Sequence, residues 1–442
     1  MTDAESVREI AQPLRGDANN YDALVNLIGD ARVVLLGEAS HGTHEFYFER
    51  AQISKRLIAE KNFTVLAIEA DWPDASRVHR YVRGASADAN ANEALSSFRR
   101  FPAWMWRNTV VVEFVEWLRE FNQRLDPKHA PAGFYGMDLY SLHASIDAVL
   151  NYLEKVDPES AKRARLRYSC FDHFSREPQE YGYAATVGAV ESCENAVVEQ
   201  LTELQRKASE FLSRDGHIAA EELFFAEQNA RLVKNAEQYY RSMFRGRASS
   251  WNLRDRHMVE TIEALVAHLN GSRQPKAIVW AHNSHLGDAR ATEMSQRGEL
   301  NVGQLIRDRF GKDAVLIGFT THHGSVTAAS DWGADAERKN VRPALRGSYE
   351  ELFHETGAER FWIDLRRMGE KVPDALCGPR LERAIGVIYR PESERLSHYF
   401  HARLPKQFDA LIHIDETRAV EPLERTSVWD EGELPQTFPF QV

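Results

Sequence analysis

The stretch VVLLGEASHG, residues 33–42, joins a continuous apolar run to a short polar turn. An unbroken apolar run of this length is typical of a β-strand buried on both faces in a parallel sheet. The run is followed by Glu38 and His41, so the strand delivers two ionisable side chains at its carboxyl end. Open parallel α/β sheets bind their ligands at this end of the strands. The stretch therefore predicts both a fold class and the position of a site.

Three later apolar runs end in the same way. Each is followed by an ionisable residue: Glu69 in VLAIEADW (65–72), Asp138 in FYGMDLYS (134–141), and His282 with His285 in AIVWAHNSHLGD (277–288). Because the carboxyl ends of parallel strands meet at one edge of a sheet, we expect these side chains to lie close to Glu38 and His41.

The order of segments predicts an α/β fold with a mostly parallel central sheet flanked by helices. Helical spacing of apolar residues follows the first strand over residues 44–61 and recurs from about 90 to 125. Strands are expected at 30–37, 62–70, 131–140, 275–283, 313–321, 359–365, 384–390 and 409–415. We expect residues 1–141 and 271–442 to form the core, and 142–270 to form a helical insertion that serves as a lid or pocket wall.

Composition limits the classes of partner. The formal net charge of −11 disfavours a surface built to bind nucleic acid or anionic lipid, so the expected partner is a small molecule. The start lacks a signal-peptide pattern, and no run of about 18 apolar residues occurs. Cys170, Cys193 and Cys377 form no CxxC pair, and such an odd, sparse set predicts unpaired thiols in a reducing compartment. Together these features predict a cytoplasmic protein without membrane contact.

Absent motifs disfavour three kinds of enzyme. The chain has no GxSxG turn, no GxxxxGK[ST] loop and no GxGxxG after its first strand. These absences disfavour a serine hydrolase of the α/β type, a P-loop nucleotidase and a dinucleotide oxidoreductase. Hydrolysis by an activated water molecule remains.

The first turn suits general base catalysis. Gly37 and Gly42 bracket Glu38 and His41, which favours a tight turn at the mouth of the strand. A neutral imidazole at His41 would accept a proton from water, and Glu38 or Glu69 would orient it. The structural alternatives are that Ser40 caps the next helix and that His41 is an ordinary turn residue.

The other candidates also have structural alternatives. Glu69 would pair with Arg50 or Arg77 if its role were structural. His282 and His285, three apart, would present both rings on one side of a helical turn, suitable for a substrate oxygen or a metal ion.

Weaker arguments predict that a further set of residues lines or supports the pocket. His322 and His323 follow a strand, but adjacent side chains on an extended segment point opposite ways, so at most one would face the pocket. The remaining members of this set are Arg390, at the end of an expected strand, and Trp104, Trp106 and Trp117, which wall a cavity or pack in the core. His44 is expected to pack or to face solvent.

These segments together resemble the erythromycin esterase family, which also includes succinoglycan-biosynthesis-like proteins. The resemblance is carried by GEASHGTHEFYFER (37–50), AIEADWP (67–73), YGMDLYS (135–141) and WAHNSHLGD (280–288), and it extends from about residue 20 to 420. It implies ester or lactone hydrolysis without a required cofactor. His41 would be the general base with Glu38 beside it. The other positions of the family's motifs fall on Arg50, Glu69, His282 and His285. The shared motifs do not specify a macrolide substrate.

Three hypotheses follow. In the first, His41, Glu38 and Glu69 are catalytic, and Arg50, His282, His285 and Asp138 bind substrate or stabilise an oxyanion. In the second, a divalent metal such as zinc or manganese is held by Glu38, His41, Glu69, His282 and His285. In the third, the pocket binds a small molecule without catalysis.

Overall fold

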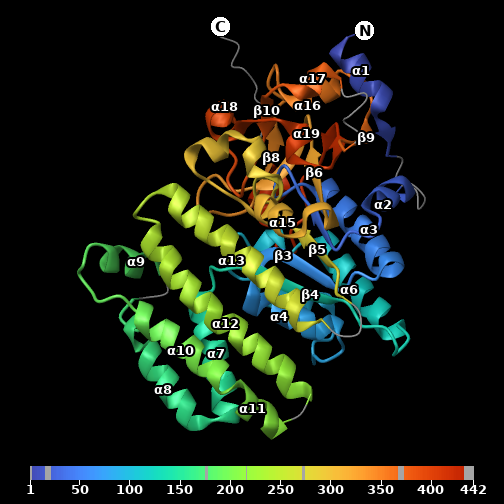
Figure 1. Cartoon of the computed structure of the whole chain (residues 1–442). Coiled ribbons are helices and arrows are strands. Elements are labelled where there is room, and N and C mark those ends of the chain that lie inside the picture. Colours follow the sequence, from blue (N-terminus) through green and yellow to red (C-terminus); the bar gives the residue numbers. More distant parts are fainter. Residues whose placement is uncertain are drawn as a thin grey trace.

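The central feature of the computed structural model is an eight-stranded sheet in the order β1-β9-β12-β6-β2-β5-β3-β4 (Figure 1). The structure describes residues 2–14, 21–174, 178–215, 217–270, 274–366 and 373–432. The strands are β1 (Gln12–Pro13), β2 (Val33–Leu36), β3 (Val65–Asp71), β4 (Gly133–Asp138), β5 (Ala277–Trp280), β6 (Ala314–Thr320), β9 (Arg360–Asp364) and β12 (Ala410–Ile414).

Strand direction confirms the mostly parallel sheet. The strands from β12 to β4 all pair in parallel, whereas β9 and β1 form an antiparallel edge. Strand β5 lies between β2 and β3, although it follows both in sequence. The carboxyl ends of β2, β5, β3 and β4 are therefore neighbours, and these are the strand ends that carry the predicted site residues.

The continuous apolar runs are explained by two cores, one on each face of the sheet. In β2, Val33 and Leu35 face one core, and Val34 and Leu36 face the other. Side chains on successive strand residues point to opposite faces, so a strand covered on both sides needs apolar residues throughout.

Helices cover both faces of the sheet. The core that contains Val34 receives side chains from α2 (Asp22–Ile28), α3 (His44–Lys61), α4 (Trp72–Val82), α5 (Ala91–Ala94) and α6 (Thr109–Arg124). The core that contains Val33 receives them from α1 (Asp3–Ile10), α7 (Leu142–Val156), α12 (His217–Ser242), α13 (Arg247–His268), α15 (Val302–Phe310) and α16 (Tyr349–His354).

Residues 142–268 form a layer of helices, visible in green and yellow in Figure 1. Between α7 and α12 the layer contains α8 (Pro158–Tyr168), α9 (Pro178–Thr186), α10 (Glu194–Arg206) and α11 (Ala208–Asp215). Its apolar residues belong to the same core as Val33 and Leu35 of the sheet. Helix α13 contacts β3 and β4 and leads into β5, so it crosses the sheet beside the predicted site.

One predicted strand is wrong. Residues 384–390 make only isolated bridges, from Ile385 to Ser40 and from Ile388 to Ala329. Ile385 and Tyr389 instead pack in a small separate apolar cluster, which explains why this segment has a strand-like composition.

Two smaller sheets and several short helices complete the described chain. The sheets contain β10 (Arg380–Arg383) with β11 (Tyr399–Ala402), and β7 (His323–Ala328) with β8 (Glu337–Val341) and β13 (Glu416–Thr417). The helices are α14 (Asn283–Leu286), α17 (Asp374–Cys377), α18 (Glu394–Ser397), α19 (Leu404–Gln407) and α20 (Ser427–Glu431). Among the described residues, no helix has the length and apolar character needed to cross a bilayer.

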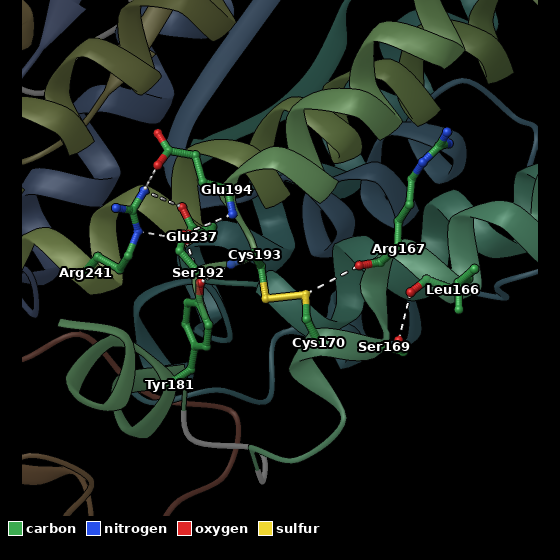
Figure 2. The surroundings of a disulfide bond; sticks show 10 residues. All are labelled: Leu166, Arg167, Ser169, Cys170, Tyr181, Ser192, Cys193, Glu194, Glu237 and Arg241. Carbon is green, nitrogen blue, oxygen red and sulfur yellow. Dashed lines mark hydrogen bonds and ion pairs between the residues drawn. A yellow bond between two sulfur atoms is a disulfide. The ribbon is translucent and has the colours of Figure 1, made fainter. Parts of the chain in front are cut away.

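The prediction of three unpaired thiols is wrong for two of them. Cys170 and Cys193 form a disulfide with a Cα–Cα distance of 6.1 Å (Figure 2). Cys377 is free and exposed. The cysteine spacing did not reveal the pair because packing of the helical layer, not sequence proximity, brings the two residues together. Beside the bond, the Cys193 amide donates to the Tyr181 hydroxyl at 2.9 Å.

We expect the disulfide to be detectable by alkylation of the unfolded chain. Without reductant, only Cys377 should react, and after reduction all 3 cysteines should react. Replacing Cys170 and Cys193 by serine should lower the free energy of unfolding by about 3 kcal/mol, because the bond closes a loop. Cys377→Ser is the matched control and should leave stability unchanged. Labelling of every cysteine without reductant would contradict the pairing.

Candidate active site

The turn after β2 forms a hydrogen-bonded pair between a carboxylate and an imidazole. Glu38 Oε1 lies 2.9 Å from His41 Nδ1, and both residues are buried. The Tyr47 hydroxyl donates to the His41 carbonyl at 2.7 Å, which fixes the backbone of the turn against helix α3. His41 is therefore held by its Nδ1 atom, and its other ring nitrogen, Nε2, is left for a different partner.

Gly37 and Gly42 are required because other chain segments approach the turn closely. A Cβ atom on Gly37 would lie 2.1 Å from Asn283 Oδ1, and one on Gly42 would lie 1.8 Å from the Thr327 carbonyl oxygen. Neither glycine has a positive φ. The predicted tight turn thus depends on close packing, not on a backbone conformation reserved for glycine.

Arg50 holds the second oxygen of the Glu38 carboxylate. Its Nη2 atom donates to Glu38 Oε2 at 2.6 Å, and its guanidinium lies over the rings of Tyr47 and Trp280. The side chain is 0% exposed. A guanidinium in this position fixes the charge and orientation of Glu38, and its burial does not fit the predicted contact with substrate.

Glu69, at the end of β3, is paired with an arginine of the helical layer. Arg254 Nη2 donates to Glu69 Oε1 at 2.7 Å, and the His282 amide donates to Oε2 at 2.9 Å. The predicted structural partners Arg50 and Arg77 bind other carboxylates. Burial favours the neutral carboxyl, but the charges of His285, Arg254 and His41 outweigh it, so the pKa of Glu69 is well below its usual value.

Arg254 also holds Asp138, at the end of β4. Its Nε donates to Asp138 Oδ1 at 2.9 Å and its Nη2 to Oδ2 at 2.7 Å. One guanidinium therefore joins the ends of two neighbouring strands to helix α13. This two-oxygen contact is the geometry in which arginine binds a carboxylate most strongly.

His285 lies between two carboxylates. Its Nδ1 is 2.9 Å from Asp255 Oδ1, and its Nε2 is 3.4 Å from Glu69 Oε1. The ring stacks on Trp251 at 4.4 Å. Burial disfavours the charged imidazole, but Asp255 and Glu69 outweigh it and raise the pKa of His285.

His282 has the opposite character. Burial, followed by the charge of His41, lowers the pKa of His282 to about 3, so the ring is neutral near pH 7. The Ser284 amide donates to His282 Nδ1 at 3.2 Å, which assigns the ring proton to Nε2. Nε2 is buried and makes no hydrogen bond of good geometry to any described residue, although the Ala39 backbone lies close enough to raise the pKa of the ring. The rings of His282 and His41 are 4.8 Å apart, so this donor lies beside the base.

Two cavities meet at His41 and Glu69. One is lined by Asp71, Asp74, Phe98, Arg100, Phe101, Trp106, Asp138, Tyr140, Arg254 and Trp332, among others. The second, of about 570 Å³, is lined by Trp251, Arg254, His282, His285, Met294, His398 and Tyr399, among others. This volume is in the range of small-molecule sites. Burial, followed by the charge of Asp71, raises the pKa of Asp74 in the first cavity to about 7.

The structure brings six of the seven predicted site residues to these cavities or directly behind their walls, and it places Arg50 deeper. The weaker candidates His322, His323 and Arg390 fall outside the described linings of both cavities, so their prediction as pocket-wall residues is wrong. Of the three tryptophans, Trp106 lines the first cavity, and its Nε1 donates to the Glu69 carbonyl at 3.3 Å.

The predicted metal-ligand set does not converge in the described chain. Three or more metal-ligating side chains come together there at His322, His323 and Asp415, not at the catalytic cluster. Glu38 and Glu69 each already bind a guanidinium. This pairing neutralises the two carboxylates that a metal ion would need most.

Arg254 and Asp255 contact the predicted site residues but were not themselves predicted from the sequence. Both come from the segment interpreted as a lid, far in sequence from the strand ends. A signal was present: Asp255 lies on the buried stripe of α13 that continues through Met258, Val259, Ile262 and Leu265. A carboxylate in register with a buried helical face requires a partner.

Comparison with known proteins assigns the chain to a family. A family model described as erythromycin esterase matches residues 58–417, well over half of the 442 residues. The chain belongs to the erythromycin esterase family. The predicted family is thus confirmed, and membership indicates a hydrolase. The matched range begins after Glu38 and His41, so the assignment of roles to these two residues depends on their geometry.

Similar proteins align with nearly the whole chain. Erythromycin esterase type II of Escherichia coli is 22% identical over 435 residues, which cover 91% of this chain and 94% of that protein. The crystal structure of a Bacillus cereus protein has a TM-score of 0.74 at 22% identity and covers 96% of this chain and 98% of that one. Erythromycin esterase EreC in its open conformation has a TM-score of 0.68 at 17% identity, with coverages of 94% and 98%.

We expect Arg254→Gln to destabilise the fold. The change leaves Glu69 and Asp138 buried without their counter-charge, which should cost about 3 kcal/mol of unfolding free energy at pH 7. Pairing lowers the pKa of folded Glu69 below 4.5, so its contribution is complete above that pH and is lost as the pH falls further. The difference between variant and wild type in urea unfolding should therefore shrink below about pH 4.5.

Arg297→Gln is the matched control because Arg297 pairs with Glu293 at the surface. It should change the unfolding free energy by less than about 0.5 kcal/mol. Equal stability of Arg254→Gln and this control at pH 7 would contradict the structural role of Arg254.

Proposed function

We propose that this protein hydrolyses an ester, lactone or related acyl bond of a small molecule by means of a water molecule activated by His41. The observation that carries the proposal is the buried chain Arg50–Glu38–His41, which ends at the cavities. Glu38 holds His41 through Nδ1, so the unprotonated nitrogen of the neutral ring is Nε2. That nitrogen is the base toward a water molecule in the cavity.

The reaction needs one proton acceptor that later becomes a donor. His41 Nε2 removes a proton from water as the water oxygen attacks the acyl carbon. The negatively charged Glu38 favours the imidazolium that forms. When the tetrahedral intermediate collapses, the imidazolium gives this proton to the leaving oxygen, so the products are a carboxylic acid and an alcohol, or one hydroxy acid from a lactone.

His282 suits the stabilisation of the oxyanion. Its neutral ring carries its proton on Nε2, beside His41 and without a competing partner of good geometry in the described chain. A donor that is already in place and poorly satisfied gains a hydrogen bond when negative charge develops on the carbonyl oxygen. His285, whose pKa is raised, lies in the same cavity wall.

Glu69, Asp138 and Arg254 act as positioning residues in this proposal. Glu69 accepts the His282 amide and the Arg254 guanidinium, so it fixes the turn that presents His282. Asp138 fixes the other side of Arg254. Arg50 acts in the same way on Glu38, in place of the substrate contact predicted from sequence.

The cavity walls favour a substrate that has an apolar body. Phe98, Phe101, Trp106 and Trp332 line the first cavity, and Trp332 remains 60% exposed. Large aromatic surface of this kind gains free energy when a ligand covers it. The reacting acyl group would lie at His41, and the apolar body of the substrate would extend toward these rings.

We expect His41→Ala to lower kcat/KM by about 100- to 10,000-fold on any substrate that the wild type hydrolyses. The assay is a panel of esters and lactones, macrolide lactones included, with product formation followed by mass spectrometry. His44→Ala is the matched control because His44 lies three residues later, at the start of α3, and contacts Arg418. Its activity should remain near that of the wild type.

Three outcomes would overturn this mechanism. Full turnover by folded His41→Ala would exclude His41 as the base. Stoichiometric binding of zinc or manganese that is lost in His282→Ala would favour the metal-dependent alternative at the same cluster. Tight binding of a ligand that stays chemically unchanged would favour the non-catalytic alternative.

We expect His282→Ala to lower kcat by about 100- to 1,000-fold with little change in KM, because the lost hydrogen bond forms mainly in the transition state. Steady-state kinetics separate the two constants. A raised KM with unchanged kcat would show that His282 binds the ground state instead.

A further inference from the structure

A second cluster of histidines lies at the carboxyl end of the same sheet, away from the catalytic residues. His322 and His323 follow β6, and His413 and Asp415 belong to the end of β12, the parallel neighbour of β6. His354 ends helix α16. The cluster is thus built from a different pair of strands than the catalytic site, which uses β2, β5, β3 and β4.

The two adjacent histidines point their rings toward the same place. His322 Nδ1 and His323 Nδ1 are 3.0 Å apart. The expectation that their side chains diverge is wrong because the chain turns here. The amides of both residues donate to the Asp415 carbonyl, each at 3.1 Å. This backbone contact ties the histidines to the residue whose carboxylate completes the cluster.

Three ligand atoms converge. One atom from each of His322, His323 and Asp415 lies within 4.8 Å of the others. Ligand atoms that bind one ion at about 2.0–2.2 Å lie at most about 4 Å apart, so small side-chain rotations suffice. Two ring nitrogens facing each other share at most one proton between them, whereas a cation between them would satisfy both lone pairs.

A second layer of histidines holds these ligands. His354 Nδ1 lies 2.9 Å from both carboxylate oxygens of Asp415, and its ring stacks on that of His322 at 3.8 Å. His413 Nδ1 contacts Thr320 Oγ1 at 3.0 Å, and its Nε2 is 3.4 Å from Asp415 Oδ1. Outer partners of this kind orient metal ligands and increase their affinity.

We propose that His322, His323 and Asp415 form a binding site for a divalent transition-metal ion, with Zn²⁺ as the preferred ion. Two imidazoles and one carboxylate suit zinc better than magnesium or calcium, which prefer oxygen ligands. His323 and Asp415 are partly exposed, so an ion reaches the site from solvent and water completes its coordination.

The ion would fix the point where a small sheet leaves the large one. Strand β7 begins at His323, β13 begins directly after Asp415, and the two strands pair in parallel with Glu416 opposite His323. The same small sheet supports the catalytic turn, because Thr327 and Val420 both donate to the Gly42 carbonyl. The site is therefore a structural clamp that acts at a distance from the reacting atoms.

The proposal is tested by metal titration of the full chain after treatment with a chelator. Co²⁺ binding is followed by visible absorption and Zn²⁺ binding by calorimetry. We expect one equivalent of each ion to bind, with a zinc-dependent rise in Tm. His323→Ala and Asp415→Asn should each weaken binding at least 100-fold, and His354→Ala by about 10- to 100-fold. His129→Ala, in an exposed loop, is the control and should bind like the wild type.

His282→Ala distinguishes this site from the catalytic cluster and should also bind like the wild type. The Tm of each metal-free variant, compared with that of the metal-free wild type, shows whether the variant folds. If His323→Ala does not fold, His323→Gln is measured in its place. The proposal is overturned if wild type binds neither ion, if folded His323 and Asp415 variants retain affinity, or if affinity is lost in His282→Ala instead.

Discussion

The position of β5 between β2 and β3 is the constraint on which the rest of the structure depends. The chain builds β2, β3 and β4 first, then returns through the helical layer to insert β5. This return forces α13 to cross β3 and β4 before β5 begins. Arg254 is thereby placed opposite Glu69 and Asp138, which precede it by more than a hundred positions, and Asp255 is placed opposite His285. The catalytic histidines from β2 and β5 become neighbours for the same reason.

Charge alternates through the interior of the site. Arg50, Glu38 and His41 form one series, and Asp138, Arg254 and Glu69 form another that His285 and Asp255 extend. An isolated charge in such a buried place would be strongly destabilising, whereas each carboxylate here contacts a guanidinium or an imidazole. The arrangement also sets contrasting protonation states: His282 is neutral, while the pKa of His285 is raised.

The sequence was sufficient for the parts of the fold that depend on local pattern. Apolar runs identified the strands of the large sheet except the two-residue β1, and the ends of these runs located Glu38, His41, Glu69 and His282. Contacts between distant segments were not predictable in this way. The Cys170–Cys193 bond, the pairing of Arg254 with Glu69, and the convergence of His322 with His323 all depend on where the chain returns in space. Residues 384–390 show the converse error, because a packed loop can have the composition of a strand.

The shared core of the sheet and the helical layer has a consequence for attempts to change specificity. Arg247, Trp251 and Arg254 of the helical layer line the second cavity, which suggests a module that could be exchanged for that of a relative. The layer, however, also supplies the guanidinium and the carboxylate that hold Glu69 and His285. A graft of the whole segment would have to reproduce these contacts and the packing beneath them. Engineering of this scaffold is therefore better confined to side chains on the aromatic wall, such as Phe101 and Trp332, than directed at the helices behind it.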